Sequence, residues 1–280
     1  MYLESKLRQD GNLVPFNTVN EEATYTKLKI IDHIQASMVN DCEGFFLEYQ
    51  PVISQHAGTC VGAEALVRWQ NEEYGTVYPN DFIPTLSVDL AFEELGLWPI
   101  REVMKNGLQF LQKQPNFCIG LNIEATQLKD AYFEESLIEA ADQLKFPLEN
   151  LCLELHRHCR LLNREMLKRK LETLHSIGVQ LIMDDYGVGY GSLEYLRAFP
   201  WTYVKSDIRL LKDIEHSETV QKDFLNLSKF VETHHINMCA KGVESETMQN
   251  ILINMGINHM QGFALGRPVS AKQFMETYLS

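Results

Sequence analysis

The most constraining feature of this sequence is a regular alternation of short apolar, β-branched segments with longer segments of helical periodicity, which begins near residue 45. Segments with the length and composition of strands lie at Phe45–Gln50, Val61–Trp69, Phe117–Ile123, Leu151–Leu155, Val179–Met183, Thr202–Lys205, Ile236–Ala240 and Ile257–Phe263. Helical patterns lie between most of them, at Pro99–Gln112, Thr126–Leu144, Asn163–Ile177, Glu218–His234 and Glu246–Met255. Strands that alternate with helices predict a largely parallel sheet covered by helices.

The number of candidate strands favours closure of this sheet. The expected fold class is therefore α/β, a (β/α)8 TIM-like barrel with an N-terminal lead-in helix. The pattern alone also permits an open, doubly wound sheet. A chain of 280 residues, of which 45% are apolar, has the length and the composition of one such barrel with a large core.

The first forty residues have a different pattern. Thr18 and Glu21 have the spacing of a capping box, and an apolar stripe follows at Leu28, Ile31, Ile34 and Met38. This pattern predicts a helix over Val19–Asn40 that leads into the barrel and packs either on it or on a second copy of the chain. We therefore expect two parts: an N-terminal arm and linker helix over residues 1–40, and the barrel domain over residues 41–280.

Composition excludes several classes of protein. A net charge of −13 disfavours binding to a nucleic-acid polymer, because such binding depends on Lys and Arg that neutralise phosphates. The chain begins without the apolar region of a signal peptide and contains no membrane-spanning apolar segment, so we expect a cytoplasmic protein. The six cysteines form no CxxC pair and are expected to be reduced thiols of the core.

Polar residues recur where the predicted strands end. In barrels of this class the functional groups come from the carboxyl ends of the strands. The residues at these positions are Glu64, Asn122, Glu154, Asp184, Asp185, Lys205, Asp207, Lys241 and Gln261. Any one acid alone is explained equally well as a salt-bridged structural residue. Several together at one barrel mouth indicate bound cations, because carboxylates suit Mg²⁺, Mn²⁺ or Ca²⁺ and are costly to bury unpaired.

These positions lie within motifs that carry a family resemblance. The motifs are, in order, YQPV (Tyr49–Val52), GAEALVRW (Gly62–Trp69), LNIEATQL (Leu121–Leu128), LCLEL (Leu151–Leu155), DDYGVGYGSL (Asp184–Leu193), VKSD (Val204–Asp207), KGVE (Lys241–Glu244) and QGFALGRP (Gln261–Pro268). This series resembles the EAL phosphodiesterase family from about Phe45 to the C-terminus. More weakly, Ser5–Asn17 resembles the tail of a diguanylate-cyclase-type domain, which indicates a preceding cyclase-like or sensor domain in a longer protein.

The resemblance implies binding of cyclic di-GMP and hydrolysis of one of its phosphodiester bonds with two divalent cations, Mg²⁺ or Mn²⁺, with Ca²⁺ inhibitory. It implies metal ligands at Glu64, Asn122, Glu154, Asp184 and Asp185. It assigns Lys205 to orient the attacking water, so that the catalytic candidates are Lys205, Asp185 and, at an altered position, Lys241. It implies contacts with the nucleotide from Gln50, Glu64, Leu66, Arg68, Asp207, Glu244 and Gln261, and it implies a homodimer.

Two positions depart from the family pattern. Active members carry Glu where this chain has Lys241, and an ammonium beside a divalent ion is repelled by about 4 kcal/mol for each unit pair at ~4 Å and an effective dielectric near 20. We therefore expect one bound metal rather than two. The second departure is Arg157, where the family often has a Glu that anchors the loop after Asp184 and Asp185. In that loop Val188 and Gly191 also replace hydroxyl residues.

Three functions remain open on these grounds. The favoured one is a cyclic di-GMP-binding domain with weakened or lost hydrolysis. The second is an active phosphodiesterase that produces the linear dinucleotide and uses Lys241 as a neutral base, and the third is a protein-interaction module without nucleotide binding. The histidines His156, His158, His234 and His235 are expected to be ordinary loop or helix-end residues.

Overall fold

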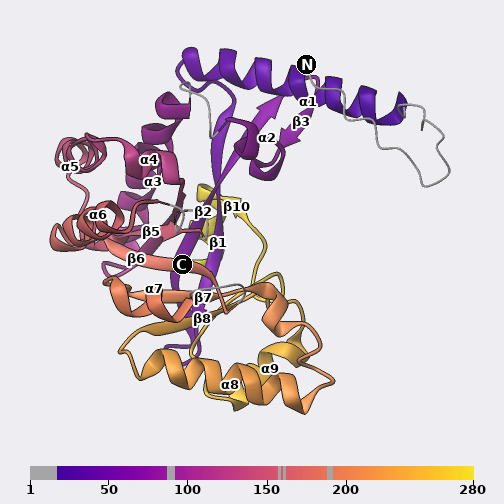
Figure 1. Ribbon diagram of the computed structural model, residues 1–280, viewed down its shortest axis with the longest axis vertical. Coiled ribbons are helices and arrows are strands. Elements are labelled where there is room, and N and C mark those ends of the chain that lie inside the picture. Colours follow the sequence, from indigo (N-terminus) through magenta and orange to yellow (C-terminus); the bar gives the residue numbers. More distant parts are fainter. Residues whose placement is uncertain (1–17, 87–91, 157–158, 160–161, 188–191) are drawn as a thin grey trace.

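The computed structural model describes residues 18–280 except 87–91, 157–158, 160–161 and 188–191 (Figure 1). Its described strands form one sheet in which neighbours follow the order β10-β1-β9-β8-β7-β6-β5-β4-β2-β3, and β1 also pairs with β2. This extra pairing closes the sheet into a barrel. The barrel strands are β1 (Phe45–Ser54), β2 (Thr59–Asn71), β4 (Cys118–Ile123), β5 (Leu151–Leu155), β6 (Gln180–Tyr186), β7 (Tyr203–Ser206), β8 (Asn237–Lys241) and β9 (His259–Gln261). The predicted barrel and all eight predicted strand positions are confirmed, and an open sheet is excluded.

One strand departs from the expected parallel arrangement. Strands β2, β4, β5, β6, β7, β8 and β9 are parallel to their successive neighbours, whereas β1 is antiparallel to both β2 and β9. The connection from β1 to β2 consists of only the turn at residues 55–58. A turn of this length can join only antiparallel strands, because a parallel crossover needs a dozen residues or more. Two short strands, β3 (Gly75–Val77) and β10 (Val269–Ser270), extend the sheet outside the barrel.

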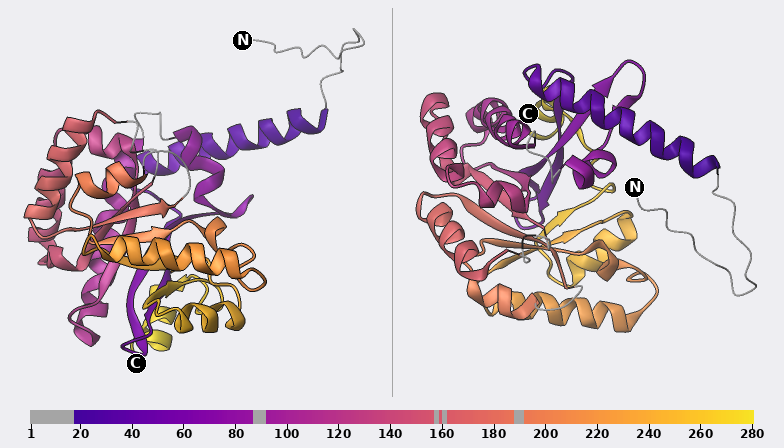
Figure 2. Two further views of the ribbon diagram at one scale, coloured as in Figure 1. Left: turned by 60° about the horizontal axis from the view of Figure 1, so that its bottom comes forward. Right: turned by 45° about the horizontal axis from the view of Figure 1, so that its top comes forward.

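The helices surround the strands as an outer layer (Figure 2). They are α2 (Pro79–Leu86), α3 (Phe92–Lys113), α4 (Ala125–Lys129), α5 (Phe133–Leu144), α6 (Arg164–Ser176), α7 (Ser192–Ala198), α8 (Glu218–Glu232), α9 (Glu246–Asn254) and α10 (Ala271–Tyr278), with 3₁₀ turns at Leu148–Asn150 and Ile208–Leu211. The single helix predicted over Thr126–Leu144 is wrong. It is divided into α4 and α5, because Asp130 Oδ1 accepts a hydrogen bond of 2.9 Å from the backbone N–H of Tyr132 and stabilises a turn there.

The lead-in helix α1 (Thr18–Val39) is present and extends outward from the barrel (Figure 2). Ile31, Ile34 and Met38 are buried and share a small core with Trp69 of β2 and Phe82 of α2. Leu28, the first residue of the expected stripe, is 53% exposed. The stripe therefore finds its partner surface within the same chain.

The barrel interior positions the polar residues at one end. Along each strand alternate side chains point the same way, so Cys152, Ile182 and Cys239 lie one layer below Glu154, Asp184 and Lys241. These three lower side chains are buried and largely apolar. None of the six cysteines, each of them a described residue, forms a disulfide. Within the described part of the chain no helix combines the length and the apolarity that crossing a membrane requires.

Candidate functional site

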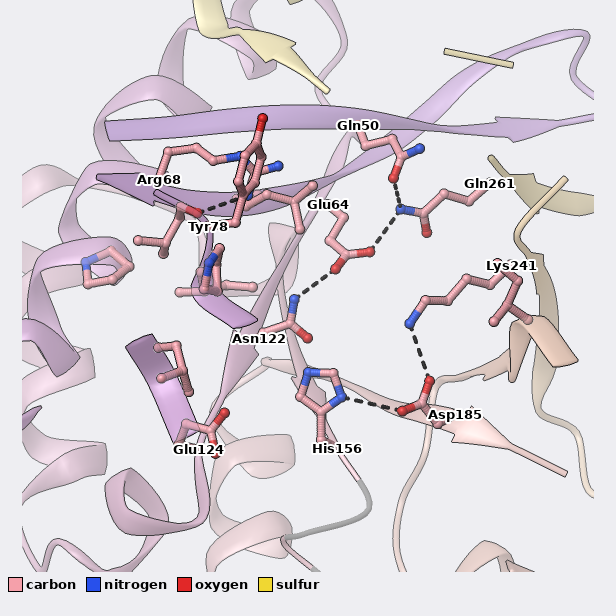
Figure 3. Close-up of a pocket in the computed structure, with 18 of the residues that line it drawn as sticks. Gln50, Glu64, Arg68, Tyr78, Asn122, Glu124, His156, Asp185, Lys241 and Gln261 are labelled. Carbon is pink, nitrogen blue, oxygen red and sulfur yellow. Dashed lines mark hydrogen bonds and ion pairs between the residues drawn. The ribbon is translucent and has the colours of Figure 1, made fainter. Parts of the chain in front are cut away.

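A pocket of about 640 Å³ opens at the carboxyl ends of the barrel strands (Figure 3). Its volume is in the range of sites for nucleotides and other small molecules. The pocket brings together predicted residues from six segments, namely Gln50, Glu64, Leu66, Arg68, Asn122, Asp185, Lys241, Glu244 and Gln261. Glu154, Asp184 and Lys205 are fully buried at the same end of the barrel. Lys205 contacts the lining residue Glu64, Asp184 contacts the lining residue Lys241, and Glu154 contacts Lys205.

Lys205 joins two carboxylates at the base of the pocket. Its Nζ donates to Glu64 Oε2 and to Glu154 Oε1, each at 2.7 Å, and all three side chains are almost completely buried. Burial opposes the charge on Lys205, but the two carboxylates raise its pKa well above the ordinary value. Burial and the neighbouring Glu64 raise the pKa of Glu154 to about 7. Although burial would raise the pKa of Glu64, Lys205 and then Lys241 lower it to about 2.

Strand packing fixes the position of Glu154. In the β4–β5 register Gly120 is paired with Cys152, and Asn122 with Glu154. A Cβ atom on Gly120 would overlap the Glu154 carboxylate. The absence of a side chain at residue 120 therefore provides the space in which this carboxylate lies, directly beside Asn122.

Several acceptor atoms at this base have no hydrogen-bond partner among the described residues. They are Glu154 Oε2, Asn122 Oδ1 and Gln261 Oε1, all buried. Asn122 Nδ2 meanwhile donates to Glu64 Oε1 at 2.7 Å. An unpartnered buried oxygen is costly, and carboxylate and amide oxygens are the ligands that hard divalent cations prefer. Glu154 and Asn122, two of the four residues predicted for the first metal site, therefore each offer a buried oxygen to a divalent cation.

The second group of acids is already paired with a cation of the protein itself. Lys241 Nζ lies 2.9 Å from Asp184 Oδ1, 2.7 Å from Asp184 Oδ2 and 3.4 Å from Asp185 Oδ1. Burial disfavours its charge, but Asp184 and Glu64 raise the pKa of Lys241 above its ordinary range. The ammonium therefore remains protonated and contacts both oxygens of Asp184.

His156 completes this group, contrary to the expectation of an ordinary loop histidine. Its Nδ1 lies 3.2 Å from Asp184 Oδ2 and 3.8 Å from Asp185 Oδ2. One ligand atom from each of the three residues lies within 4.8 Å of the others, close enough to hold a metal ion. Despite burial, the two nearby carboxylates raise the pKa of His156 to about 10. The sequence did contain a signal, because His156 follows Glu154 by two positions at the end of β5.

Asp184 and Asp185 are both held in the ionised form. Burial would raise the pKa of Asp184, but His156 and then Lys241 lower it to about 2. The nearby imidazole of His156 is the largest cause that lowers the pKa of Asp185 to about 2. Asp185 has a φ of +52°, a left-handed conformation that turns its carboxylate away from the regular strand direction and into the pocket.

Lining residues of β1, β2 and β9 are connected by hydrogen bonds between their side chains. Gln261 Nε2 donates to Gln50 Oε1 at 3.0 Å and to Glu64 Oε2 at 2.8 Å, as Figure 3 shows. Gln50 Nε2 in turn donates to the backbone carbonyl of Gly266 at 3.1 Å. Arg68 lines the pocket but is only 6% exposed, and its Nε donates to Glu48 Oε2 at 2.8 Å. Part of the Arg68 donor set is therefore engaged within the protein.

Asp207 does not lie with the pocket-lining residues. It is 3% exposed, and its carboxylate accepts hydrogen bonds from the backbone N–H and the side chain of Arg209. These bonds cap the 3₁₀ turn that follows β7. Arg157, His158, Val188 and Gly191 lie outside the described residues. Lining residues that the sequence did not single out as site candidates include Tyr78, Glu124, His156 and Phe263.

Comparison with known proteins decides the family. The family model described as "EAL domain" matches residues 33–268. The chain belongs to the EAL domain family. This match and the barrel fold both confirm the family resemblance that the sequence motifs indicated.

Relatives of this EAL domain include enzymes of cyclic di-GMP turnover. The chain is 29% identical over 268 residues to the cyclic di-GMP phosphodiesterase PdeR of Escherichia coli, a match that covers 96% of the chain and 40% of PdeR. It is 29% identical over 230 residues to the bifunctional diguanylate cyclase/cyclic di-GMP phosphodiesterase MucR of Pseudomonas aeruginosa, which covers 82% of the chain and 34% of MucR. The EAL domain therefore spans well under half the length of these relatives.

Solved structures confirm the fold. The structure entitled "PaMucR Phosphodiesterase, c-di-GMP complex" superposes with a TM-score of 0.80 at 27% identity, covering 87% of this chain and 99% of that one. The EAL enzyme Bd1971, in its form bound to cAMP and cyclic di-GMP, gives a TM-score of 0.84 at 22% identity, covering 93% of this chain and 71% of that one. The second match concerns the barrel architecture alone.

Proposed function

We propose that this EAL domain binds cyclic di-GMP in the pocket at the carboxyl end of the barrel and has weakened or lost hydrolytic activity. The observation that carries the proposal is the position of Lys241, whose ammonium contacts both oxygens of Asp184 and one oxygen of Asp185. A second catalytic cation would need these same oxygens. The domain would then act in second-messenger signalling as a receptor for the nucleotide.

The binding half of the proposal is supported by the pocket and by the relatives. Gln50, Glu64, Arg68, Glu244 and Gln261 all line one cavity of suitable volume. Arg68 has donors beyond those that Glu48 and the Val67 carbonyl engage, and a guanidinium suits a phosphate through charge-assisted hydrogen bonds. The solved structure of the MucR phosphodiesterase is a complex with cyclic di-GMP. This retained lining argues against a protein-interaction module without nucleotide binding.

The metal half of the proposal is one divalent cation, Mg²⁺ or Mn²⁺, held by Glu64, Asn122 and Glu154, while Asp184, predicted as its fourth ligand, is paired with Lys241. The unpartnered Glu154 Oε2 and Asn122 Oδ1 support this assignment. Such an ion, when bound, would polarise a phosphoryl oxygen of the ligand. Lys205 holds Glu64 and Glu154 in position, and Lys241 supplies positive charge at the Asp184–Asp185 pair.

An active phosphodiesterase is the alternative, because Glu64, Asn122, Glu154, Asp184, Asp185 and Lys205 are all retained. Under that alternative Lys241 would act as a neutral base. Its acidic neighbours raise the pKa of Lys241, and this shift opposes such a role.

The test separates binding from turnover. The protein is incubated with cyclic di-GMP and Mn²⁺ or Mg²⁺, and the linear dinucleotide is measured by chromatography. Calorimetry in Ca²⁺, where hydrolysis is expected to be inhibited, measures binding alone. Saturable binding with turnover far below 1 s⁻¹ supports the proposal, whereas turnover at about 1 s⁻¹ or faster establishes the active enzyme. We place the domain in the cytoplasm, as a homodimer within a longer signalling protein, on the family resemblance alone.

A further inference from the structure

Tyr78 is an aromatic residue at the rim of the pocket that the motif series does not include. It lies between the end of β3 and the start of α2, lines the pocket and is 52% exposed. Its backbone is well fixed, because its carbonyl accepts a hydrogen bond of 2.9 Å from the N–H of Asp81 in the first turn of α2. Pro79, the first residue of that helix, restricts the backbone further.

The ring of Tyr78 lies against Arg68 of β2. The Arg68 guanidinium carbon is 4.9 Å from the ring centroid, a cation–π distance. The guanidinium cannot readily move away, because its Nε is bound to Glu48 at 2.8 Å and its Nη1 to the Val67 carbonyl at 2.9 Å. One face of the ring is therefore supported by a fixed, buried cation, and Tyr78 lines the pocket with about half of its surface exposed.

A supported and exposed ring is a suitable surface for a purine base. The cation beneath the ring draws electron density from it, and stacking on an electron-rich base such as guanine becomes more favourable. Bases stack on aromatic side chains without needing a matched hydrogen-bond pattern. Phe263 has a similar arrangement. It lines the pocket and is 51% exposed, and its ring centroid lies 4.3 Å from the guanidinium carbon of Arg267.

We infer that Tyr78 binds one purine base of the ligand by stacking, so that Arg68, the Tyr78 ring and the base form three successive layers. This inference rests on the proposed function, because it takes cyclic di-GMP as the ligand. It adds a base-binding residue at the β2–β3 side of the pocket. A nucleotide with two purines also matches a pocket whose rim carries two arginine-supported rings.

The first test compares substitutions that separate ring stacking from simple coverage of Arg68. Calorimetry with cyclic di-GMP in Ca²⁺ should give a Kd about 5- to 150-fold higher for Tyr78→Leu, the range of one base–aromatic stack. Tyr78→Phe keeps the ring and should stay within about threefold of the wild type. Tyr132→Leu is the matched control, because Tyr132 is 67% exposed and does not line the pocket. It should leave the Kd unchanged.

The second test is spectroscopic. A Tyr78→Trp variant should show fluorescence quenching as cyclic di-GMP is added, beyond any change in the wild type, in which Trp69 and Trp201 are buried and Trp98 is half-buried. An unchanged Kd in Tyr78→Leu, with no added quenching in Tyr78→Trp, would overturn the stacking role while leaving the proposed function intact. A wild-type protein that does not bind cyclic di-GMP would overturn both. A higher Kd in Tyr78→Leu together with quenching supports the inference.

Discussion

Replacing Lys241 with Glu should raise phosphodiesterase turnover at least about 10²-fold. In the wild type the Lys241 ammonium lies 2.7 Å and 2.9 Å from the two oxygens of Asp184 and 3.4 Å from Asp185. A cation that shared these carboxylates would therefore lie within a few ångströms of a fixed positive charge. The Lys241→Glu substitution removes that charge, frees the Asp184 oxygens and adds a carboxylate that can act as a ligand or a base.

The size of the effect follows from electrostatics. Two unit charges about 4 Å apart at an effective dielectric near 20 interact by about 4 kcal/mol, and a divalent ion beside Lys241 carries twice the unit charge. A 10²-fold rate increase requires only about 2.7 kcal/mol. The expected gain is thus smaller than the repulsion that the substitution removes, even if only part of that repulsion is recovered in the transition state.

The assay is the rate of linear dinucleotide formation in Mn²⁺, followed by chromatography for the wild type, Lys241→Glu and Lys241→Gln. The Gln variant is the matched control, since it removes the charge without supplying a carboxylate, and it should recover less activity. Arg157→Glu combined with Lys241→Glu should raise turnover further, because it restores the Glu that in the family anchors the loop after Asp184 and Asp185. A wild type that already turns over at about 1 s⁻¹, or a Lys241→Glu protein that binds two ions without faster turnover, would show that Lys241 does not suppress hydrolysis.

Further predictions concern affinity, metal content, stability and assembly. Arg68→Ala should weaken cyclic di-GMP binding by about 1.5–3 kcal/mol in calorimetry, through loss of charge-assisted phosphate bonds; an unchanged affinity would exclude a phosphate contact. Crystals soaked in Mn²⁺ should give one anomalous peak per chain, and two full-occupancy ions ~3.5–4 Å apart would contradict this. Lys205→Met should lower the free energy of unfolding by about 3–5 kcal/mol in chemical denaturation, because Glu64 and Glu154 lose their shared cation; a change under 1 kcal/mol would count against that role. Light scattering should give a dimer mass rather than the monomer mass of 32.3 kDa.

Much of the fold could be predicted because each barrel strand is a short apolar segment bounded by turns or helices. Strand direction is less visible in composition, and the antiparallel β1 was missed although the short turn at residues 55–58 encodes it. The division between α4 and α5 depends on a single side chain, Asp130, within an otherwise continuous helical pattern. The packing of the α1 stripe on Trp69 and Phe82 required contacts between segments that lie far apart in the sequence.

The candidate site was predicted to a similar degree, for a topological reason. Parallel strands bring their carboxyl ends to one edge, so Glu64, Asn122, Glu154 and Asp184 were expected to converge. The hydrogen-bond and ion-pair partners of individual side chains could not be derived in this way. Arg68 of β2 is paired in register with Phe46 of β1, but its side chain reaches diagonally to Glu48, which also lies on β1. Asp207 is bound to Arg209, two residues along the chain, and Tyr78 lies outside every strand.

The central claim, that this EAL domain holds cyclic di-GMP and scarcely hydrolyses it, is tested most directly by the chemical state of the bound nucleotide. The protein is mixed in excess with cyclic di-GMP and Mn²⁺, free nucleotide is removed after several minutes, and the nucleotide released by denaturation is identified by mass spectrometry. The account predicts that most of the nucleotide is retained by the protein and is still cyclic. Recovery of the linear dinucleotide, or the absence of any retained nucleotide at ~100 μM protein, would contradict it.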